Sequence, residues 1–461
     1  MAPCIRYAFC ALFACLLSLS SRVRAQTLSL PLDTIALPPG FSIDLYTSTP
    51  LPSARTLVLS DNTTAGNIVY VSTNRLNNVY AVIDRNSDGI ADSVVTVVSN
   101  LPAPLGLAYA NGSLWVATTP TIYRFDNVDE LALAGMNFSD PAVILPDLGM
   151  PSDHGNHYMT IGPDGMIYFN LGAPFNIGSP LPAVGTRDLT FGTIARMTPD
   201  GQNISTFATG IRNVVGMQFH PVTNTLYFSN NGRDQVGDDL PDDYIAYAPV
   251  EGLNFGYPHC HRLGSGDPAL RSPGPGTPFP DPEFPPPAIE AFNGSFAQQT
   301  GYCAVTQTPP VQTVGPHVAT LGIKFYTGGM FPAAYNMSII NAQHGSWDRT
   351  PPLGYRVMVL NLNDDGLAQN YSSLAEGWLF PNGTAWGRPA DVLPLPDGSV
   401  LVSDDTAGAV YRITYSAELA ASSMSNRTAD SPDFAGGVLP ELILAPAPAI
   451  STEAAAASTA G

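Results

Sequence analysis

Short apolar segments and polar turns alternate along most of the chain. Each apolar segment is rich in Val, Ile, Tyr or Leu and ends at a turn of Gly, Asn or Asp, and helical periodicity is almost absent. Such runs predict β-strands joined by hairpins. They group into six units of similar but not identical sequence, at residues 57–84, 104–127, 152–210, 214–249, 319–363 and 390–415.

Six units of three or four strands each predict an all-β fold, a six-bladed β-propeller. Residues 30–46 would supply a strand that closes the ring against the last unit, and closure removes exposed sheet edges. A double-sheet sandwich is the alternative, but the chain is too long for one sandwich and the units are too regular for two. Residues 261–316, rich in Pro and Gly, are interpreted as an insertion between the fourth and fifth units, and residues 417–461 as a disordered tail.

The first residues of the chain indicate the compartment. Arg6 precedes a continuous apolar run from Ala8 to Leu19, and small residues flank Ala25. This pattern is typical of a secretory signal peptide at residues 1–25, and the apolar run is too short to span a membrane. We therefore expect a secreted, extracellular protein whose propeller domain occupies residues 26–416, with no membrane segment.

Cysteines and glycosylation motifs agree with an oxidising compartment. Three of the five cysteines lie in the expected signal peptide, and Cys260 and Cys303 remain. A single pair of this kind is most simply a disulfide, which would close the insertion. Asn-x-Ser/Thr motifs are spread over the whole chain and predict a glycoprotein. They begin at Asn62, Asn111, Asn137, Asn203, Asn293, Asn336, Asn370, Asn382 and Asn426.

The formal net charge of −19 makes nucleic acid an unexpected partner, because an acidic surface repels phosphate backbones. Lysine occurs once, at Lys324, and the other cations are few. Several of them nevertheless stand in or near the loops that lead into predicted inner strands, and in a propeller those loops converge on one mouth of the central channel. The candidate residues of this mouth, cationic and neutral or acidic together, are Asp153, His154, Arg212, Asn213, Lys324 and Arg388, with His344, Trp347 and Arg349 after a strand of the fifth unit.

His154 leads into a hairpin whose turn is Gly162 to Gly165, and an imidazole of near-neutral pKa at such a rim can accept a proton. The cations around it would repel one another without an anionic partner. A planar ligand with several carboxylates would satisfy them, because Arg binds carboxylates bidentately and stacks on ring faces. Internal ion pairs with the abundant Asp residues are the alternative.

Two acidic runs are candidate calcium sites. Asp84 to Asp92 has oxygen ligands at alternate positions and a Gly at the bend, but Val95 stands where a calcium loop has Glu, and a plain turn is equally compatible. In the second run, Gly232 to Asp243, five Asp residues lie close together. Their mutual repulsion favours a bound cation.

Four motifs, in this order, resemble the soluble quinoprotein dehydrogenases, a family that includes glucose, sorbosone, aldose sugar and fungal pyranose dehydrogenases. They are DHGNHYMTIGPDGMIYFNLG, GIRNVVGMQFHPVTNTLYFSNNGRDQVGDDLPDD, AQHGSWDRTPPLGYRV and GRPADVLPLPDGSVLVSDD. The resemblance extends over about residues 37–415. It implies a six-bladed propeller that holds pyrroloquinoline quinone (PQQ) and Ca²⁺ at the channel mouth.

The resemblance also implies roles. His154, accompanied by Asp153, matches the base that takes the proton of the sugar C1 hydroxyl while hydride leaves C1 for PQQ. Residues matching cofactor contacts are Arg212, Asn213 and Arg388, with His344, Trp347 and Arg349 in the HGSW segment of sorbosone-type members. Lys324, which matches no clear motif, is expected to reach a PQQ carboxylate because of its position and because it is the only lysine. The segment that matches the calcium-binding main chain is Gly237, Asp238, Asp239 and Leu240.

The sequence departs from the family pattern at two positions. Ala173 stands where the glucose dehydrogenases have a carboxylate that orients the catalytic imidazole, so Asp153 or a carbonyl would take that role. His157 stands where sorbosone-type members usually have Arg, which weakens one cofactor contact.

The resemblance implies oxidation of C1 of an aldose or 2-ketoaldose, with a cytochrome, a quinone or a copper enzyme as the external electron acceptor. Two other functions fit a secreted propeller. One is a non-catalytic module that binds a glycan or a protein, and the other is a calcium-dependent lactonase.

Overall fold

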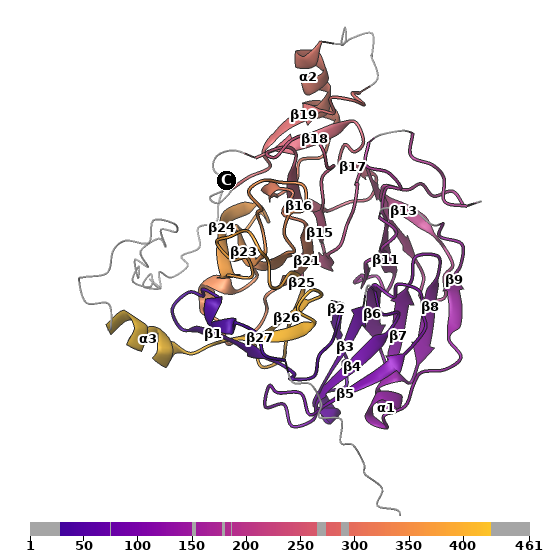
Figure 1. Ribbon diagram of the computed structural model, residues 1–461. Helices are drawn as coiled ribbons and strands as arrows, with labels where there is room; N and C mark the ends of the chain where they lie inside the picture. The colour runs from indigo at the N-terminus through magenta and orange to yellow at the C-terminus, as the bar shows by residue number, and fades with distance from the viewer. Residues whose placement is uncertain are drawn as a thin grey trace, which may run out of the picture.

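The computed structural model shows a ring of small sheets (Figure 1). The expected signal peptide and residues 426–461 of the expected tail lie outside the described residues. The described residues are 28–73, 75–149, 154–177, 180–185, 187–264, 273–286 and 295–425.

Within these ranges, six sheets of four or five strands are arranged radially, which confirms the predicted six-bladed β-propeller. Blade 1 contains β2 (Ala54–Leu59), β3 (Asn67–Thr73), β4 (Val79–Asp84) and β5 (Ser93–Val98). Blade 2 contains β6 (Gly106–Ala110), β7 (Ser113–Ala117), β8 (Ile122–Asp126) and β9 (Ala142–Leu145), with α1 (Val128–Leu133) before β9. Blade 3 contains β10 (Met159–Ile161), β11 (Ile167–Leu171), β12 (Thr193–Met197), β13 (Ser205–Thr209) and the parallel strand β17 (Leu253–Asn254).

The remaining blades follow the same antiparallel order, and short 3₁₀ turns connect some of the strands. Blade 4 contains β14 (Met217–Phe219), β15 (Leu226–Asn230), β16 (Asp242–Ala248) and β20 (Gln312–Pro316). Blade 5 contains β21 (Thr320–Phe325), β22 (Ile339–Gln343), β23 (Arg356–Leu362) and β24 (Ala368–Glu376). Blade 6 contains β25 (Pro389–Pro394), β26 (Val400–Asp404), β27 (Ala409–Tyr415) and β1 (Phe41–Leu45). The turns are η1 (Leu32–Thr34), η2 (Thr63–Ala65) and η3 (Ala333–Tyr335).

The ring is closed by the N-terminal strand, as predicted. Strand β1 pairs antiparallel with β27, from Phe41 opposite Tyr415 to Leu45 opposite Tyr411. Blade 6 therefore combines the first and last strands of the ring, and the edge that an open ring would expose is paired.

The apolar core is divided among the seams between neighbouring blades. Tyr70 of blade 1 packs with Leu107 of blade 2, and Leu57 of blade 1 packs with Val410 of blade 6 across the closing seam. Because each sheet is covered on both faces, the second strands are buried over all or nearly all of their length, which explains their continuous apolar runs. The fully buried second strands include β11, β15, β22 and β26.

The predicted insertion lies inside blade 4 and is partly ordered. The outermost strand of that blade, β20, falls within residues 261–316, so the chain leaves after β16 and returns to complete the same sheet. The excursion forms a hairpin of β18 (Cys260–Leu263) and β19 (Thr277–Pro280) and helix α2 (Phe296–Thr306), which extend beyond the ring (Figure 1). The Cys260–Cys303 disulfide is confirmed. Proline and glycine obscure the strand pattern of β20. The insertion therefore lies within the fourth blade, and not between the fourth and fifth units as predicted.

The start of the expected tail is helical, as α3 (Ala417–Ser425). Among the described residues, no helix has both the length and the apolar character needed to cross a bilayer.

Candidate cofactor site

A cavity of about 180 Å³ lies where loops of blades 3, 4 and 5 meet, at one mouth of the ring. Four residues predicted from the sequence, His154, Arg212, Asn213 and Trp347, are brought together there. Trp347 stands at the rim with 69% of its surface exposed. The other lining residues are Asn231, Gly232, Asp234, Asp243, His317 and Ala319.

The backbone of Ala173 fixes the imidazole of His154. His154 Nδ1 lies 2.6 Å from the Ala173 carbonyl oxygen, so this nitrogen carries the proton and Nε2 is the acceptor of the ring. The amide of Ala173 donates in turn to the Arg212 carbonyl at 2.8 Å, which ties His154 to the neighbouring blade. Gly172 permits this approach, because a Cβ there would lie 2.4 Å from the His154 carbonyl oxygen. Asp153 lies outside the described residues.

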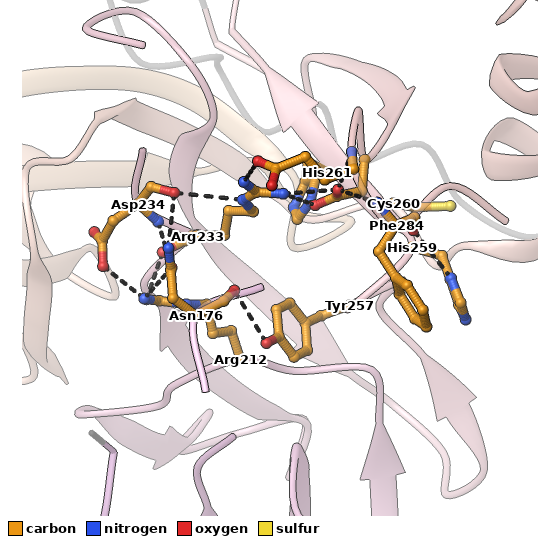
Figure 2. A network of polar contacts seen from close by, with 12 residues as sticks. Asn176, Arg212, Arg233, Asp234, Tyr257, His259, Cys260, His261 and Phe284 are labelled. Atoms are coloured by element: carbon orange, nitrogen blue, oxygen red, sulfur yellow. Dashed lines mark hydrogen bonds and ion pairs between the residues drawn. The ribbon is translucent and has the colours of Figure 1, made fainter. Parts of the chain in front are cut away.

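Arg212 is buried and held by three partners, of which Figure 2 labels Asn176 and Asp234. Its guanidinium donates to the Gly232 carbonyl at 2.6 Å, to Asn176 Oδ1 at 2.8 Å and to Asp234 Oδ2 at 2.7 Å. Asn176 Oδ1 also accepts from the Asp234 amide at 2.8 Å. The internal ion pair considered as an alternative is thus present, between Arg212 and Asp234. It fixes the orientation of the Arg212 guanidinium beside the cavity.

A second arginine, Arg233, connects this corner of the cavity to the insertion (Figure 2). Its fully buried guanidinium binds both carboxylate oxygens of Asp281, each at 2.7 Å, and also contacts Glu283. His261 Nε2 lies 2.7 Å from Asp281 Oδ2. Burial alone would raise the pKa of Asp281, but the hydrogen bonds from His261 and Arg233 hold it well below its usual range. The insertion therefore braces the segment that carries Asp234.

Three side chains of the cavity region form a group that could hold a metal ion. The ligand atoms of Asp234, His317 and Asp348 all lie within 4.8 Å of one another. Asp348 accepts from the amide of Gln235 at 2.6 Å, which holds its carboxylate next to the Asp234 loop. Carboxylate and imidazole donors of this kind suit a divalent cation.

The predicted calcium segment Gly237 to Leu240 lies beside this group at the rim. The Gly237 carbonyl accepts from His317 Nε2 at 2.9 Å and from the Leu240 amide at 3.3 Å. The Asp238 carboxylate accepts from the Thr350 amide at 3.2 Å, and the Asp239 carboxylate from Arg349 at 3.0 Å. Both carboxylates are thus engaged with the loop after Asp348.

His344 and Arg388 belong to a separate cluster across the ring. His344 Nε2 lies 2.8 Å from Asp405 Oδ1, and Asp405 Oδ2 accepts from Arg55 at 2.5 Å. Arg388 donates to the His344 carbonyl at 2.9 Å and stands over the Tyr355 ring at 5.3 Å. Burial lowers the pKa of His344 to about 4. Within the described residues, His344 and Arg388 are bound to other protein groups. Neither residue lines the cavity, so the structure does not bring them to it.

Lys324 is also placed away from the cavity, further along β21. Its ammonium donates to the Tyr158 hydroxyl at 2.6 Å and lies 5.2 Å from that ring. Burial lowers the Lys324 pKa, and the nearby Asp391 opposes that change. His157 is buried between the carbonyls of Asn170 and Thr119, at 2.8 and 2.9 Å, so its role is structural.

Asp243 lines the cavity and is one of the five Asp residues of the second acidic run, for which a bound cation is predicted from the sequence. Burial raises its pKa to about 7, and its Oδ1 accepts from the Gly232 amide at 2.7 Å. The first acidic run forms a hydrogen-bonded turn instead. Asp84 accepts from the amides of Asp88 and Gly89 at 3.2 and 3.0 Å.

Buried polar atoms without a hydrogen-bond partner indicate whether the cavity is suited to a polar ligand. Among the described residues, Arg212 Nε, Asn213 Oδ1 and Asn231 Oδ1 are buried and make no hydrogen bond, and all three residues line the cavity. Leaving such atoms unpaired is costly. Donors and acceptors of this kind fit a cofactor that carries both carboxylates and ring N–H groups, as PQQ does.

The ring of six blades and the polar cavity at its mouth define the class of propellers that the sequence motifs resemble. The chain belongs to the TrAA12-like family, whose model matches residues 36–416. This match confirms the resemblance found in the sequence.

The chain is also similar to several individual proteins. A Trichoderma reesei enzyme of carbohydrate-active enzyme family AA12, solved with iodide, superimposes with a TM-score of 0.69 at 18% identity, over 84% of this chain and 99% of that one. The pyrroloquinoline quinone-dependent pyranose dehydrogenase of Coprinopsis cinerea is 26% identical over 245 residues, 44% of this chain and 30% of that protein. An uncharacterized protein of Borreliella burgdorferi is 25% identical over 390 residues, 83% of this chain and 91% of that protein.

Proposed function

We propose that the protein is a secreted, PQQ- and calcium-dependent dehydrogenase that oxidises C1 of a pyranose and passes the electrons to an external acceptor. The observation that carries this proposal is the juxtaposition of an oriented imidazole, His154, with a cavity whose buried polar atoms lack partners. The family match and the pyranose dehydrogenase relative support the choice of cofactor and substrate class.

Two neighbouring groups of residues at the cavity would hold the cofactor and the metal. Arg212 Nε, Asn213 and Asn231 would bind PQQ, since their buried atoms have the hydrogen-bonding capacity for it. The carboxylates of Asp234 and Asp348 would bind Ca²⁺, with His317 beside them and hydrogen-bonded to the Gly237 carbonyl. Bound PQQ would supply a quinone that accepts a hydride, and a nearby cation would increase its electrophilicity.

His154 would serve as the general base. The Ala173 carbonyl keeps the proton on Nδ1, so Nε2 is the nitrogen that can take a proton from a sugar hydroxyl. The same contact would stabilise the imidazolium once Nε2 is protonated. Trp347, exposed at the rim, would offer a flat face to the sugar ring.

Reconstitution tests the proposal directly. The purified protein is incubated with PQQ and CaCl₂, and the bound cofactor is followed by its absorption while a panel of pyranoses is added. We expect sugar-dependent bleaching and reduction of an artificial dye. Failure of PQQ to bind, or dye reduction without PQQ, contradicts the proposal.

The first mutational prediction concerns His154→Ala. We expect kcat to fall by about 10²–10⁴ because the general base is lost, while the Kd for PQQ stays close to that of the parent protein. Steady-state kinetics and a PQQ titration measure the two quantities. His220→Ala, at the other end of strand β14, is the matched control and should retain full activity. An unchanged kcat in His154→Ala removes this residue from catalysis.

A metal-dependent hydrolase is the second candidate, favoured by the Asp234, His317 and Asp348 group. It predicts lactone hydrolysis with calcium alone. The same preparation, assayed with a sugar lactone without PQQ, separates the two functions.

A further inference from the structure

A larger groove, of about 430 Å³, lies on the opposite face of the ring from the cofactor cavity. Arg212 and Asn213 precede strand β14, whereas the groove begins after it, at His220. Turns of blades 4 and 5 form its walls, so it bridges the seam between these two blades. Its lining includes His220, Tyr227, Tyr247, Asn336, Asp364 and Asp365.

The walls of this groove combine aromatic faces with hydrogen-bonding groups. Tyr227 and Tyr247 stack with ring centroids 5.8 Å apart. His220 Nδ1 accepts from the amides of Val222 and Thr223, both at 3.1 Å, so Nε2 carries the proton and is a donor. Aromatic faces attract the C–H edges of a pyranose, and the groove has the size of an ordinary ligand site.

The opposite rim is acidic. Asp364 and Asp365 follow strand β23 and are exposed, and neither carboxylate has a hydrogen-bond partner among the described residues. Asn363 Oδ1 accepts the amides of Asp365 and Leu367, at 3.1 and 2.9 Å, which fixes this turn. Carboxylates on one side and aromatic rings on the other provide the two kinds of contact that sugar hydroxyls and sugar faces require.

Asn336, the acceptor residue of an Asn-Met-Ser motif, lies in the lining of the same groove and is exposed. A glycan on its side chain would therefore start inside the groove. We propose that the groove is the binding site of the N-linked glycan carried by Asn336, whose first sugars stack on Tyr247 and hydrogen bond to the acidic rim.

Covalent attachment is the reason to favour this occupant over a free oligosaccharide, because it holds the sugar at the site at high effective concentration. The bound sugars would join blade 4 to blade 5 on the face opposite the cavity. This proposal rests on the secretory part of the proposed function and on none of its redox chemistry.

The test uses the full chain secreted from a eukaryotic host. Glycopeptide mass spectrometry should find a glycan on Asn336. Peptide N-glycosidase acting on the folded protein should release it roughly tenfold more slowly than the glycan of Asn111, an exposed residue of a hairpin turn. Asn336→Gln should lower the Tm by about 2–4 °C.

Two variants of Tyr247 show whether the ring makes the contact. Tyr247→Ala should abolish the slow release, whereas Tyr247→Phe, which keeps the ring, should preserve it. PQQ-dependent dye reduction should be equal in both variants and in Asn336→Gln, so the two proposals fail independently.

Three outcomes of the glycan experiments would overturn the inference. They are an unmodified Asn336 in the secreted protein, release of its glycan as fast as that of Asn111, and equal protection in Tyr247→Ala. Binding of added chitobiose in the groove of the fully glycosylated protein would also overturn it, because the site would then be vacant.

Discussion

Two ionic clusters at the mouth of the ring use the same residue types and differ in what they adjoin. The insertion-side cluster consists of Arg212, Arg233, Asp234, His261 and Asp281. The closure-side cluster consists of Arg55, His344, Arg388 and Asp405. In each, a carboxylate lies between an arginine and a histidine.

The difference lies in the function that each geometry permits. The closure-side cluster joins blade 1, through Arg55, to blade 6, through Asp405, and so fastens the seam at which the ring closes. The insertion-side cluster continues through Asp234 and Arg212 into the lining of the cavity, where unpaired buried atoms remain. Similar ion pairs thus serve ring closure on one side and a binding site on the other.

The largest effect is expected from Asp281→Asn. This change leaves the fully buried Arg233 guanidinium without a charged partner at the site of its strongest contact. We expect a loss of about 3–5 kcal/mol in the free energy of unfolding and weaker PQQ binding, because Asp234 and Arg212 lose their brace. Chemical denaturation and PQQ titration measure the two effects.

Glu251→Gln is the matched control for a broken ion pair. Glu251 binds Arg196 with 62% of its side chain exposed, so its loss should cost less than about 1 kcal/mol and leave PQQ affinity unchanged. If Asp281→Asn is as mild as this control, the insertion does not support the site.

A smaller effect is expected from Asp405→Asn in the closure-side cluster. The Asp405 side chain is 7% exposed and its partner Arg55 is 11% exposed, so some water can replace the lost charge. We expect a loss of about 2–3 kcal/mol in the free energy of unfolding. PQQ affinity should change less than in Asp281→Asn, and a larger change would show that the closure-side cluster belongs to the cofactor site.

The ring and part of the cavity could be predicted from the sequence because both depend on local signals. Alternating strands and turns determine the blades, and the loop before each inner strand identified His154 and Arg212. The same rule applied to the first unit points to Arg55, but no motif drew attention to this residue.

Other residues could not be found in this way. Asp281 and His261 lie in the insertion, whose path depends on tertiary contacts and on the disulfide. The expected cofactor role of Lys324 rests on its position and its uniqueness, but its depth along β21 follows from strand register, which the sequence does not determine. The structure places it against Tyr158 instead.

The smallest effect concerns the pH dependence of the closure-side cluster. Burial lowers the pKa of His344 to about 4, whereas an unfolded histidine titrates near 6.5. Between these values the unfolded chain binds a proton that the folded protein does not, so stability is complete above the unfolded pKa and is lost as the pH falls.

Acidification from pH 7 to pH 5 should therefore cost up to about 2 kcal/mol through His344. His344→Gln cannot titrate but can still donate to Asp405, so the Tm of this variant should fall less over the same interval. Thermal unfolding of both proteins at the two pH values gives the comparison. Asp281 and Asp405, whose pKa values are lowered, lose their contribution mainly below pH 5, where carboxylates of the unfolded chain begin to bind protons, so they add little over this interval. Equal losses in the two proteins would mean that His344 is accessible to protons in the folded state.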